Sequence, residues 1–156
     1  MKKTFQFDMA VNKIQFEADT AEKALTKLSL NLYKYGYVKS SYTDAILNRE
    51  KIFPTGLAFS NYGVALPHTD CCHVNKPMIA VGVLKTPVIF HNMGDANQNV
   101  SVKIIFMLAM NNSKNQLQLL SSFMENLQDT ALLENIVHAK TPERLTQIMS
   151  EKMTIY

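Results

Sequence analysis

The sequence predicts an α/β fold: a layered sandwich in which helices flank both faces of a mixed, mainly five-stranded sheet. Two observations predict this class. Three apolar runs near the middle of the chain have the length and composition of strands that are buried on both faces. Segments with helical apolar spacing stand before and after these runs, so helices are available for both faces. The 156 residues contain no linker, repeat or low-complexity tract, which indicates a single domain over 1–156.

The N-terminal part predicts one or two short strands and then a helix. Residues 4–18 alternate weakly, with β-type side chains at Phe5, Phe7, Ile14 and Phe16. The segment 19–22 (Asp-Thr-Ala-Glu) resembles a capping box that opens a helix, and Gly36 is a natural stop. One face of this helix is apolar, with Ala21, Ala24, Leu25, Leu28 and Leu32.

The middle of the chain predicts a second helix and the three buried strands. This helix is expected to start near Ser40 or Ser41 and to reach Arg49 and Glu50 before the segment 54–56 (Pro-Thr-Gly) breaks it. The apolar runs that predict strands are Val64–Leu66, Met78–Leu84 and Val100–Ala109.

The C-terminal part predicts at least two further helices. The segment 113–116 (Ser-Lys-Asn-Gln) is expected to cap the first, whose apolar stripe is Leu117, Leu120, Met124 and Leu127. The segment 141–143 (Thr-Pro-Glu) opens the last helix, with threonine at the N-cap and proline at the first helical position.

Composition excludes several classes of protein. The net charge of +3, with scattered basic residues, gives no reason to expect a nucleic-acid partner. No apolar run approaches the ~20 residues that span a bilayer, and the N-terminus lacks the apolar stretch of a signal peptide. Cys71 and Cys72, the two cysteines, are adjacent, which argues against a disulfide framework and fits a reducing compartment. We therefore expect a cytoplasmic protein and no cofactor.

The segment 63–70 (Gly-Val-Ala-Leu-Pro-His-Thr-Asp) is the most informative feature of the chain. A short apolar strand runs into Pro67, which fixes its own φ and favours an extended Leu66. His68 is therefore presented at the end of a strand, with a hydroxyl and a carboxylate directly behind it. A neutral imidazole is a good nucleophile near pH 7, so this arrangement is typical of a reactive histidine. The alternative is an ordinary loop histidine.

The usual catalytic motifs are absent from the sequence. There is no Gly-rich phosphate loop, no dinucleotide fingerprint and no Gly-x-Ser-x-Gly elbow, so no nucleotide site is predicted. The segment 68–73 (His-Thr-Asp-Cys-Cys-His) contains zinc-binding side chains, but structural zinc sites usually draw two ligand pairs from separate places. A metal-dependent hydrolase using His68, Asp70 and His73 stays as an alternative from another functional class.

Four features stand in order along residues 20–150. They are Arg49-Glu50 at a helix end, Pro54-Thr55-Gly56, Val64-Ala65-Leu66-Pro67-His68, and Phe106-Met107-Leu108-Ala109 followed by Gln116-Leu117-Gln118-Leu119-Leu120. Together they resemble the enzyme IIA components of the bacterial phosphoenolpyruvate-dependent sugar phosphotransferase system, in the fructose–mannitol superfamily. The segment 68–74 is most similar to the galactitol-type branch, because the mannitol and fructose branches usually have glycine after the histidine.

The resemblance implies a phosphotransferase that moves a phosphoryl group between proteins. His68 matches the family's phosphorylated histidine, which accepts the group from the histidine-containing phosphocarrier protein and passes it to a cysteine of enzyme IIB. A membrane enzyme IIC permease is the indirect partner, and galactitol or a related polyol is the sugar that the branch suggests. Docking is expected over a modest apolar patch that includes Phe59, Tyr62 and Leu66. An alternative of the same fold is a regulatory domain that senses phosphoryl flux.

The resemblance also implies roles for two neighbours of His68. Arg49 matches the family's arginine, whose planar fork pairs with phosphoryl oxygens. Taken alone, Arg49 is more commonly an exposed helix residue paired with Glu50 or Asp44. The backbone N–H groups after His68 and the Thr69 hydroxyl are expected to complete an oxyanion pocket.

The roles of three further positions are left open by the sequence. Many relatives have a second histidine where this chain has Gln116, which donates an N–H but does not titrate. Alternatively, Gln116 completes a capping box with Ser113. His73 lies in the same loop as His68, and this proximity in the sequence makes it a candidate to replace that second histidine. Asp70 either orients His68 by accepting from its other nitrogen or is an exposed loop acid.

Overall fold

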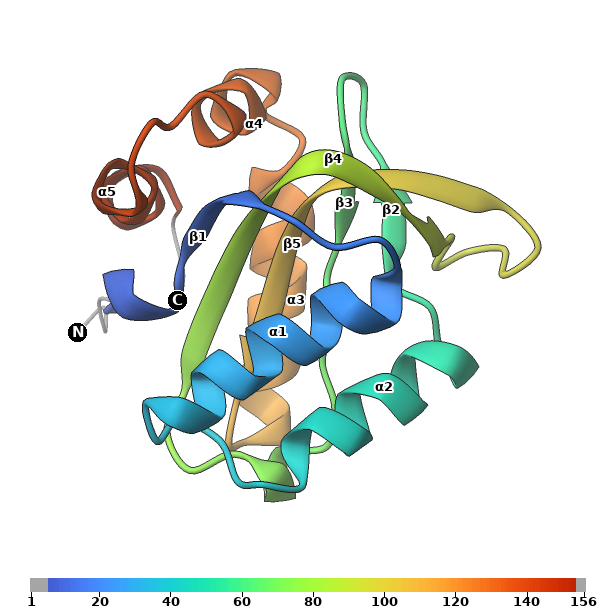
Figure 1. Ribbon diagram of the computed structural model, residues 1–156, viewed down its shortest axis with the longest axis vertical. Helices are drawn as coiled ribbons and strands as arrows, with labels where there is room; N and C mark the ends of the chain where they lie inside the picture. Colours follow the sequence, from blue (N-terminus) through green and yellow to red (C-terminus); the bar gives the residue numbers. More distant parts are fainter. Residues whose placement is uncertain (1–5, 154–156) are drawn as a thin grey trace.

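The computed structural model describes residues 6–153 and shows a five-stranded sheet with helices on both faces (Figure 1). In chain order the elements are η1 (Met9–Val11), β1 (Lys13–Phe16), α1 (Ala21–Lys34), α2 (Tyr42–Ile52), β2 (Gly56–Ala58), β3 (Gly63–Ala65), η2 (Cys71–His73), β4 (Met78–His91), β5 (Asn99–Ala109), α3 (Ser113–Asn126), α4 (Thr130–Val137) and α5 (Pro142–Lys152). The strand order is β1-β4-β5-β3-β2. The β1–β4 and β3–β5 pairs are parallel and the other two antiparallel, which confirms the mixed sheet.

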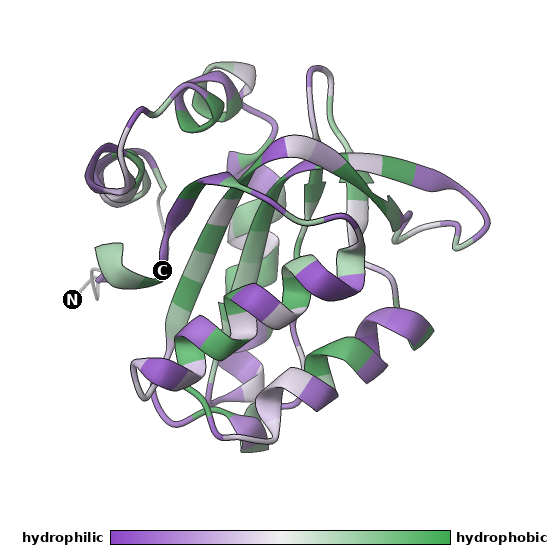
Figure 2. Ribbon diagram, in the orientation of Figure 1, coloured by the Kyte–Doolittle hydropathy of each residue, from purple (hydrophilic) through white to green (hydrophobic). Residues whose placement is uncertain are grey.

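The central strands are apolar on both faces because helices cover both. Along β5, Ile105 and Met107 pack in the cluster that contains the inner faces of α1 and α2. Ile104 and Phe106 pack in the opposite cluster, with α3, α4 and α5. This period-2 division explains why the strand reads as one continuous apolar run. Figure 2 shows hydrophobic colour along much of β4 and β5, whereas α1 and α2 alternate between hydrophobic and hydrophilic bands, as expected for helices with one apolar face.

The helix ends follow the expected chemistry at three places. Thr20 is the N-cap of α1, and its hydroxyl accepts from the backbone N–H of Lys23 at 3.2 Å. Gly36, just beyond α1, has a φ of +83°, the left-handed conformation that stops a helix. Thr141 caps α5 and accepts from Arg144 N at 3.0 Å. None of the helices within residues 6–153 combines the length and hydropathy of a membrane-spanning segment.

The expected capping box at the start of α3 is wrong. The N-cap is Asn112, whose side-chain Oδ1 accepts from Lys114 N at 3.0 Å and from Asn115 N at 3.1 Å. Asparagine is as good an N-cap as serine, and here it stands one residue earlier. Gln116 is therefore free of the capping role and its side chain points elsewhere.

The sheet differs from the prediction in two places. Over the expected region 4–18 the described part contains one strand, β1, which agrees with the one or two strands expected, and Phe5 lies outside the described residues. No expected strand corresponds to β2, which has only three residues, and no expected helix corresponds to α4. β4 continues past the expected end at Leu84 to His91, through a register shift between Val83 and Val88. Such an irregularity is where a strand tolerates a proline, here Pro87.

Two glycines let the β2–β3 hairpin lie close to its neighbours. A Cβ on Gly56 would stand 2.5 Å from the His91 carbonyl oxygen. A Cβ on Gly63 would collide with the carbonyl oxygen of Ser101 on β5. Both separations are shorter than real side chains show, so the approach of this hairpin to β4 and β5 requires glycine.

Candidate functional site

The end of β3 and the end of α2 bring His68 and Arg49 to one cavity of about 440 Å³. Thr55 and Leu66 line the same cavity. The apolar part of the lining comes from the last turn of α2, the β4–β5 loop and α3, and includes Ile52, Phe53, Met93, Leu120 and Met124. The structure therefore joins the two residues that the sequence motifs single out.

Backbone hydrogen bonds fix the segment that leads to His68. Leu66 N donates to the Thr55 carbonyl at 3.2 Å, one step beyond the Gly56–Ala65 pair of the β2–β3 hairpin. On the other side, Leu108 N of β5 donates to the Pro67 carbonyl at 2.9 Å. Hydrogen bonds to Thr55 on one side and to β5 on the other thus fix the backbone as far as Pro67, the residue before His68.

The His68 ring has one nitrogen occupied and one free for chemistry. Nδ1 lies 2.8 Å from the Leu66 carbonyl oxygen. A carbonyl only accepts, so Nδ1 carries the proton and Nε2 keeps the lone pair of the neutral ring. Burial lowers the pKa of His68 below its ordinary value, and the Arg49 charge lowers it further against the opposing effect of the Leu66 bond. The imidazole is therefore neutral near pH 7.

Arg49 is half-buried in the last turn of α2 and has a donor to spare. Its guanidinium carbon stands 4.5 Å from the centroid of the Phe53 ring. Its Nε–H is buried and has no hydrogen-bond partner among the described residues. No ion pair within residues 6–153 joins it to Glu50 or Asp44, so the interpretation of Arg49 as an exposed, paired residue is wrong. A buried donor of this kind needs an acceptor, and an anion supplies it best.

Gln116 lies behind the loop that follows His68 rather than in the cavity. Its Nε2 donates to the Thr69 carbonyl at 3.0 Å, and the Cys71 thiol donates to its Oε1 at 3.5 Å. Thr69 itself is buried. Gln116 thus ties the segment 69–71 to the first turns of α3, and both ends of its amide are engaged there.

Asp70 and His73 do not join His68. Asp70 is exposed, and the ring nitrogen that it was expected to accept from is occupied by the Leu66 carbonyl. His73 Nδ1 lies 2.7 Å from the Ser41 hydroxyl, at the start of α2. Arg49 stands at the other end of this helix, ~12 Å along its axis at 1.5 Å per residue. His73 therefore does not replace a second histidine in the cavity.

The arrangement of side chains in the described residues does not fit the metal-dependent hydrolase alternative. Within residues 6–153, no three histidine, cysteine or acidic side chains are placed to hold a metal ion together. His68, Asp70 and His73 thus do not form the site that the hydrolase hypothesis needs. Cys71 is half-buried and Cys72 exposed. Burial, Asp70 and Cys72 raise the pKa of the Cys71 thiol, which makes it a poor nucleophile and a poor ligand.

The apolar rim of the cavity differs from the expected patch. Leu66 lines the cavity, but Phe59 and Tyr62 do not; the Tyr62 hydroxyl donates to the Glu134 carboxylate at 3.2 Å. The exposed apolar side chains at the cavity are Ile52 (69%), Phe53 (56%) and Met93 (39%). Ile52 and Phe53 directly follow the arginine motif, which was the available signal. Met93 was missed because the expected strand ended at Leu84.

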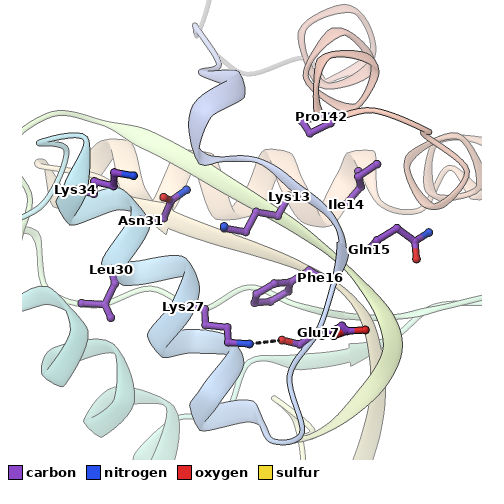
Figure 3. A pocket seen from close by; sticks show the side chains of 10 residues that line it. All are labelled: Lys13, Ile14, Gln15, Phe16, Glu17, Lys27, Leu30, Asn31, Lys34 and Pro142. Atoms are coloured by element: carbon purple, nitrogen blue, oxygen red, sulfur yellow. Dashed lines mark hydrogen bonds between the residues drawn. The ribbon is translucent and has the colours of Figure 1, made fainter.

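A larger hollow, of about 640 Å³, lies between β1 and α1 (Figure 3). Lys13, Lys27 and Lys34 stand along it. The Lys27 ammonium already donates to the Glu17 carbonyl at 2.7 Å. No residue predicted for function lines this hollow, and it contains no histidine. The smaller cavity is therefore the candidate site.

In sequence and in fold, the chain resembles proteins of one known family. The family model described as "Phosphoenolpyruvate-dependent sugar phosphotransferase system, EIIA 2" matches residues 7–152. The PTS system galactitol-specific EIIA component of Escherichia coli (strain K12) is 25% identical over 115 residues, 74% of this chain and 76% of that protein. The crystal structure of IIA mannitol from Escherichia coli has a TM-score of 0.77 at 24% identity, covering 93% of this chain and 99% of that one. A complex of enzyme IIAMTL and phosphorylated enzyme IIBMTL from Escherichia coli has a TM-score of 0.72 at 25% identity, covering 90% and 95%.

Proposed function

This chain belongs to the EIIA 2 family of the phosphoenolpyruvate-dependent sugar phosphotransferase system, and on that premise we propose that it is a phosphocarrier phosphorylated on His68. The observation that supports this most is that His68 and Arg49 line one cavity. The Nδ1 of the imidazole is held by the Leu66 carbonyl, and the Nε–H of Arg49 is buried without a hydrogen-bond partner among the described residues. A phosphoryl group on Nε2 supplies negative oxygens where that donor lacks an acceptor.

The proposed chemistry is two phosphoryl transfers. In the first, an N–P bond forms at His68 Nε2 while the bond between phosphorus and the donor's nitrogen breaks, leaving the electron pair on the donor. In the second, a thiolate attacks the same phosphorus, an S–P bond forms, and the lone pair returns to Nε2. Nδ1 keeps its proton throughout, so His68 needs no general base. Arg49 stabilises the charge on the transferring oxygens in both steps.

The proposed phosphoryl donor is the histidine-containing phosphocarrier protein, and the proposed acceptor is a cysteine of enzyme IIB. We place both transfers in the cytoplasm. Enzyme IIB in turn serves a membrane enzyme IIC. A similar protein forms a complex with phosphorylated enzyme IIB, which supports the second partner. The exposed Ile52, Phe53 and Met93 at the cavity provide an apolar rim for transient docking. Galactitol or a related polyol is the proposed sugar. This proposal is supported by the galactitol-specific EIIA component of Escherichia coli, which matches this chain over 76% of its own length.

Three further residues form or support the loop that follows the proposed phosphohistidine. We propose that the Thr69 hydroxyl and the backbone N–H groups after His68 donate hydrogen bonds to the phosphoryl oxygens. Gln116 supports that loop through the Thr69 carbonyl instead of touching the phosphoryl group. Asp70, exposed at the edge of the same loop, contributes negative charge to the docking surface.

Phosphorylation itself is the first test. The purified chain is incubated with phosphoenolpyruvate, the first enzyme of the system and the histidine-containing phosphocarrier protein, and its intact mass is measured. We expect one acid-labile phosphoryl group on the wild type and on His138→Ala, whose histidine is exposed at the end of α4. We expect none on His68→Ala. An unmodified wild type, or a modified His68→Ala, contradicts the proposal.

Onward transfer separates transport from the regulatory alternative. Phosphorylated protein is mixed with a galactitol-type enzyme IIB, and separately with a mannitol-type one, and the label on each is followed over time. Transfer to a cysteine of the galactitol type, with much slower transfer to the other, is expected. A stable phosphoprotein that gives its label to neither supports the regulatory domain instead.

A further inference from the structure

Glu50 is half-buried at the end of α2, next to Arg49 of the candidate site, yet the proposed transfer does not use its carboxylate. Its Oε1 accepts from Thr55 N at 2.8 Å, and the Thr55 hydroxyl lies 3.1 Å from Oε1 and 2.9 Å from Oε2. Burial raises the pKa of Glu50, and the Thr55 bonds oppose that shift. A buried acid is costly unless its oxygens are satisfied, and here a single residue satisfies both.

Thr55 connects this carboxylate to the imidazole. Its carbonyl accepts from Leu66 N at 3.2 Å, and the Leu66 carbonyl accepts from His68 Nδ1 at 2.8 Å. Glu50, Thr55, Leu66 and His68 thus form a continuous series of hydrogen bonds from the end of α2 to the ring. Thr55 and Leu66 are buried, so few other partners are available to either.

The same contacts keep Glu50 away from Arg49. Adjacent residues of a helix point about 100° apart, and the Glu50 oxygens are directed to the corner at Thr55. An unengaged carboxylate in the next position would be free to neutralise the guanidinium. Within residues 6–153 no such ion pair exists, and the Arg49 Nε–H is left for a ligand.

We propose that Glu50 is a positioning residue: through Thr55 it fixes the Leu66 carbonyl, holds His68 in the tautomer with the proton on Nδ1, and leaves Arg49 without an internal counter-ion. The effect of Glu50 on phosphoryl transfer rests on the proposed phosphorylation of His68. Its effect on the tautomer of the unphosphorylated protein does not depend on that phosphorylation, so each proposal can fail without the other. A histidine without a fixed acceptor distributes its proton over both nitrogens, which removes the lone pair from Nε2 in part of the molecules.

The test is a spectrum of the His68 ring nitrogens, with transfer rates alongside. Long-range proton–nitrogen correlations are recorded at about pH 8, where the ring is neutral. Wild type and Thr55→Ser, which keeps every donor, are expected to show a protonated Nδ1 and a bare Nε2. In Glu50→Gln and Thr55→Val we expect a mixture of tautomers and a phosphorylation rate reduced about tenfold. Asp44→Asn, an exposed acid on the same helix, is the matched control and should match wild type.

The outcomes separate positioning from mere stabilisation. Glu50→Gln keeps the side-chain volume and one acceptor, so it stays folded even where Glu50→Ala does not, and thermal melting verifies this. A pure Nδ1–H pattern with unchanged rates in Glu50→Gln and Thr55→Val overturns the proposal, whatever happens to their stability. A wild type with the mixed tautomer pattern overturns it as well. An unphosphorylated wild type with the expected tautomers removes the phosphocarrier function and leaves the positioning of the ring intact.

Discussion

The two ends of α2 each have a histidine nearby, and the two histidines differ in what holds them. His73, at the start of the helix, meets the Ser41 hydroxyl, which either donates or accepts and so leaves the tautomer open. His68, near the end, meets a backbone carbonyl, which only accepts. Arg49, in the last turn of α2, lines the cavity of His68 and stands about two helical turns from His73. A histidine becomes reactive through its fixed partner and a nearby charge, and proximity in the sequence provides neither.

Removing the charge at the His68 end is expected to have the largest effect. In Arg49→Leu the phosphoryl oxygens lose their cationic partner, and we expect the rate of phosphorylation by the phosphocarrier to fall about 100-fold or more. Arg49→Lys should recover part of this, since it restores the charge without the planar fork. Lys51→Leu, which removes an exposed cation in the same turn, should stay within about twofold of wild type. Equal losses in Arg49→Leu and Lys51→Leu, with Arg49→Lys at the wild-type rate, would show a nonspecific charge effect.

Titration of His68 sharpens the comparison with a smaller effect. Its pKa is lowered from 6.5, so at pH 6.5 more than half of the rings are neutral, and nuclear magnetic resonance should give a midpoint below this value. The unfolded chain then binds this proton more readily than the folded one, so acid below about pH 6.5 lowers the free energy of unfolding. His68→Ala should remove that component, and Arg49→Leu should raise the midpoint. A wild-type midpoint at or above 6.5 would mean that the ring is neither desolvated nor near Arg49's charge.

The smallest effect is expected at the other end of α2. His73→Gln keeps a group that bonds to the Ser41 hydroxyl, and phosphorylation should change by less than about twofold. The rate is measured by the same assay, with His68→Ala as the inactive reference. A loss comparable to that of Arg49→Leu would place His73 in the transfer and remove the distinction between the two ends.

The strands buried on both faces were predictable, and the shorter or irregular ones were not. Apolar runs at 78–84 and 100–109 identify the two central strands because short runs rich in valine and isoleucine are typical of strands that are buried on both faces. β2 has three residues and depends on a close approach of Gly56 to β4, which is a tertiary contact without a local pattern. The extension of β4 to His91 contains exposed polar residues and Pro87, which locally indicate a loop.

For the candidate site, motifs identified the side chains and left their partners unknown. Pro67 and the strand before it suffice to predict that His68 is presented at a strand end. Neither the Nδ1 bond to Leu66 nor the placement of Gln116 against Thr69 has a sequence signal, because both join a side chain to a backbone carbonyl. Glu50 and Thr55 were visible as motif residues, but their mutual contact depends on the turn between α2 and β2.

The glycines at the two ends of the β2–β3 hairpin have a consequence for how this site tolerates mutation. At Gly63 even one methyl group would displace the strand from Ser101, and His68 stands at the far end of that strand. Thr55, which anchors the hairpin to Glu50, directly precedes Gly56, where a methyl group would collide with His91. The placement of the His68 ring relative to the Arg49 guanidinium thus depends partly on two missing carbon atoms, at positions that contribute no functional group of their own.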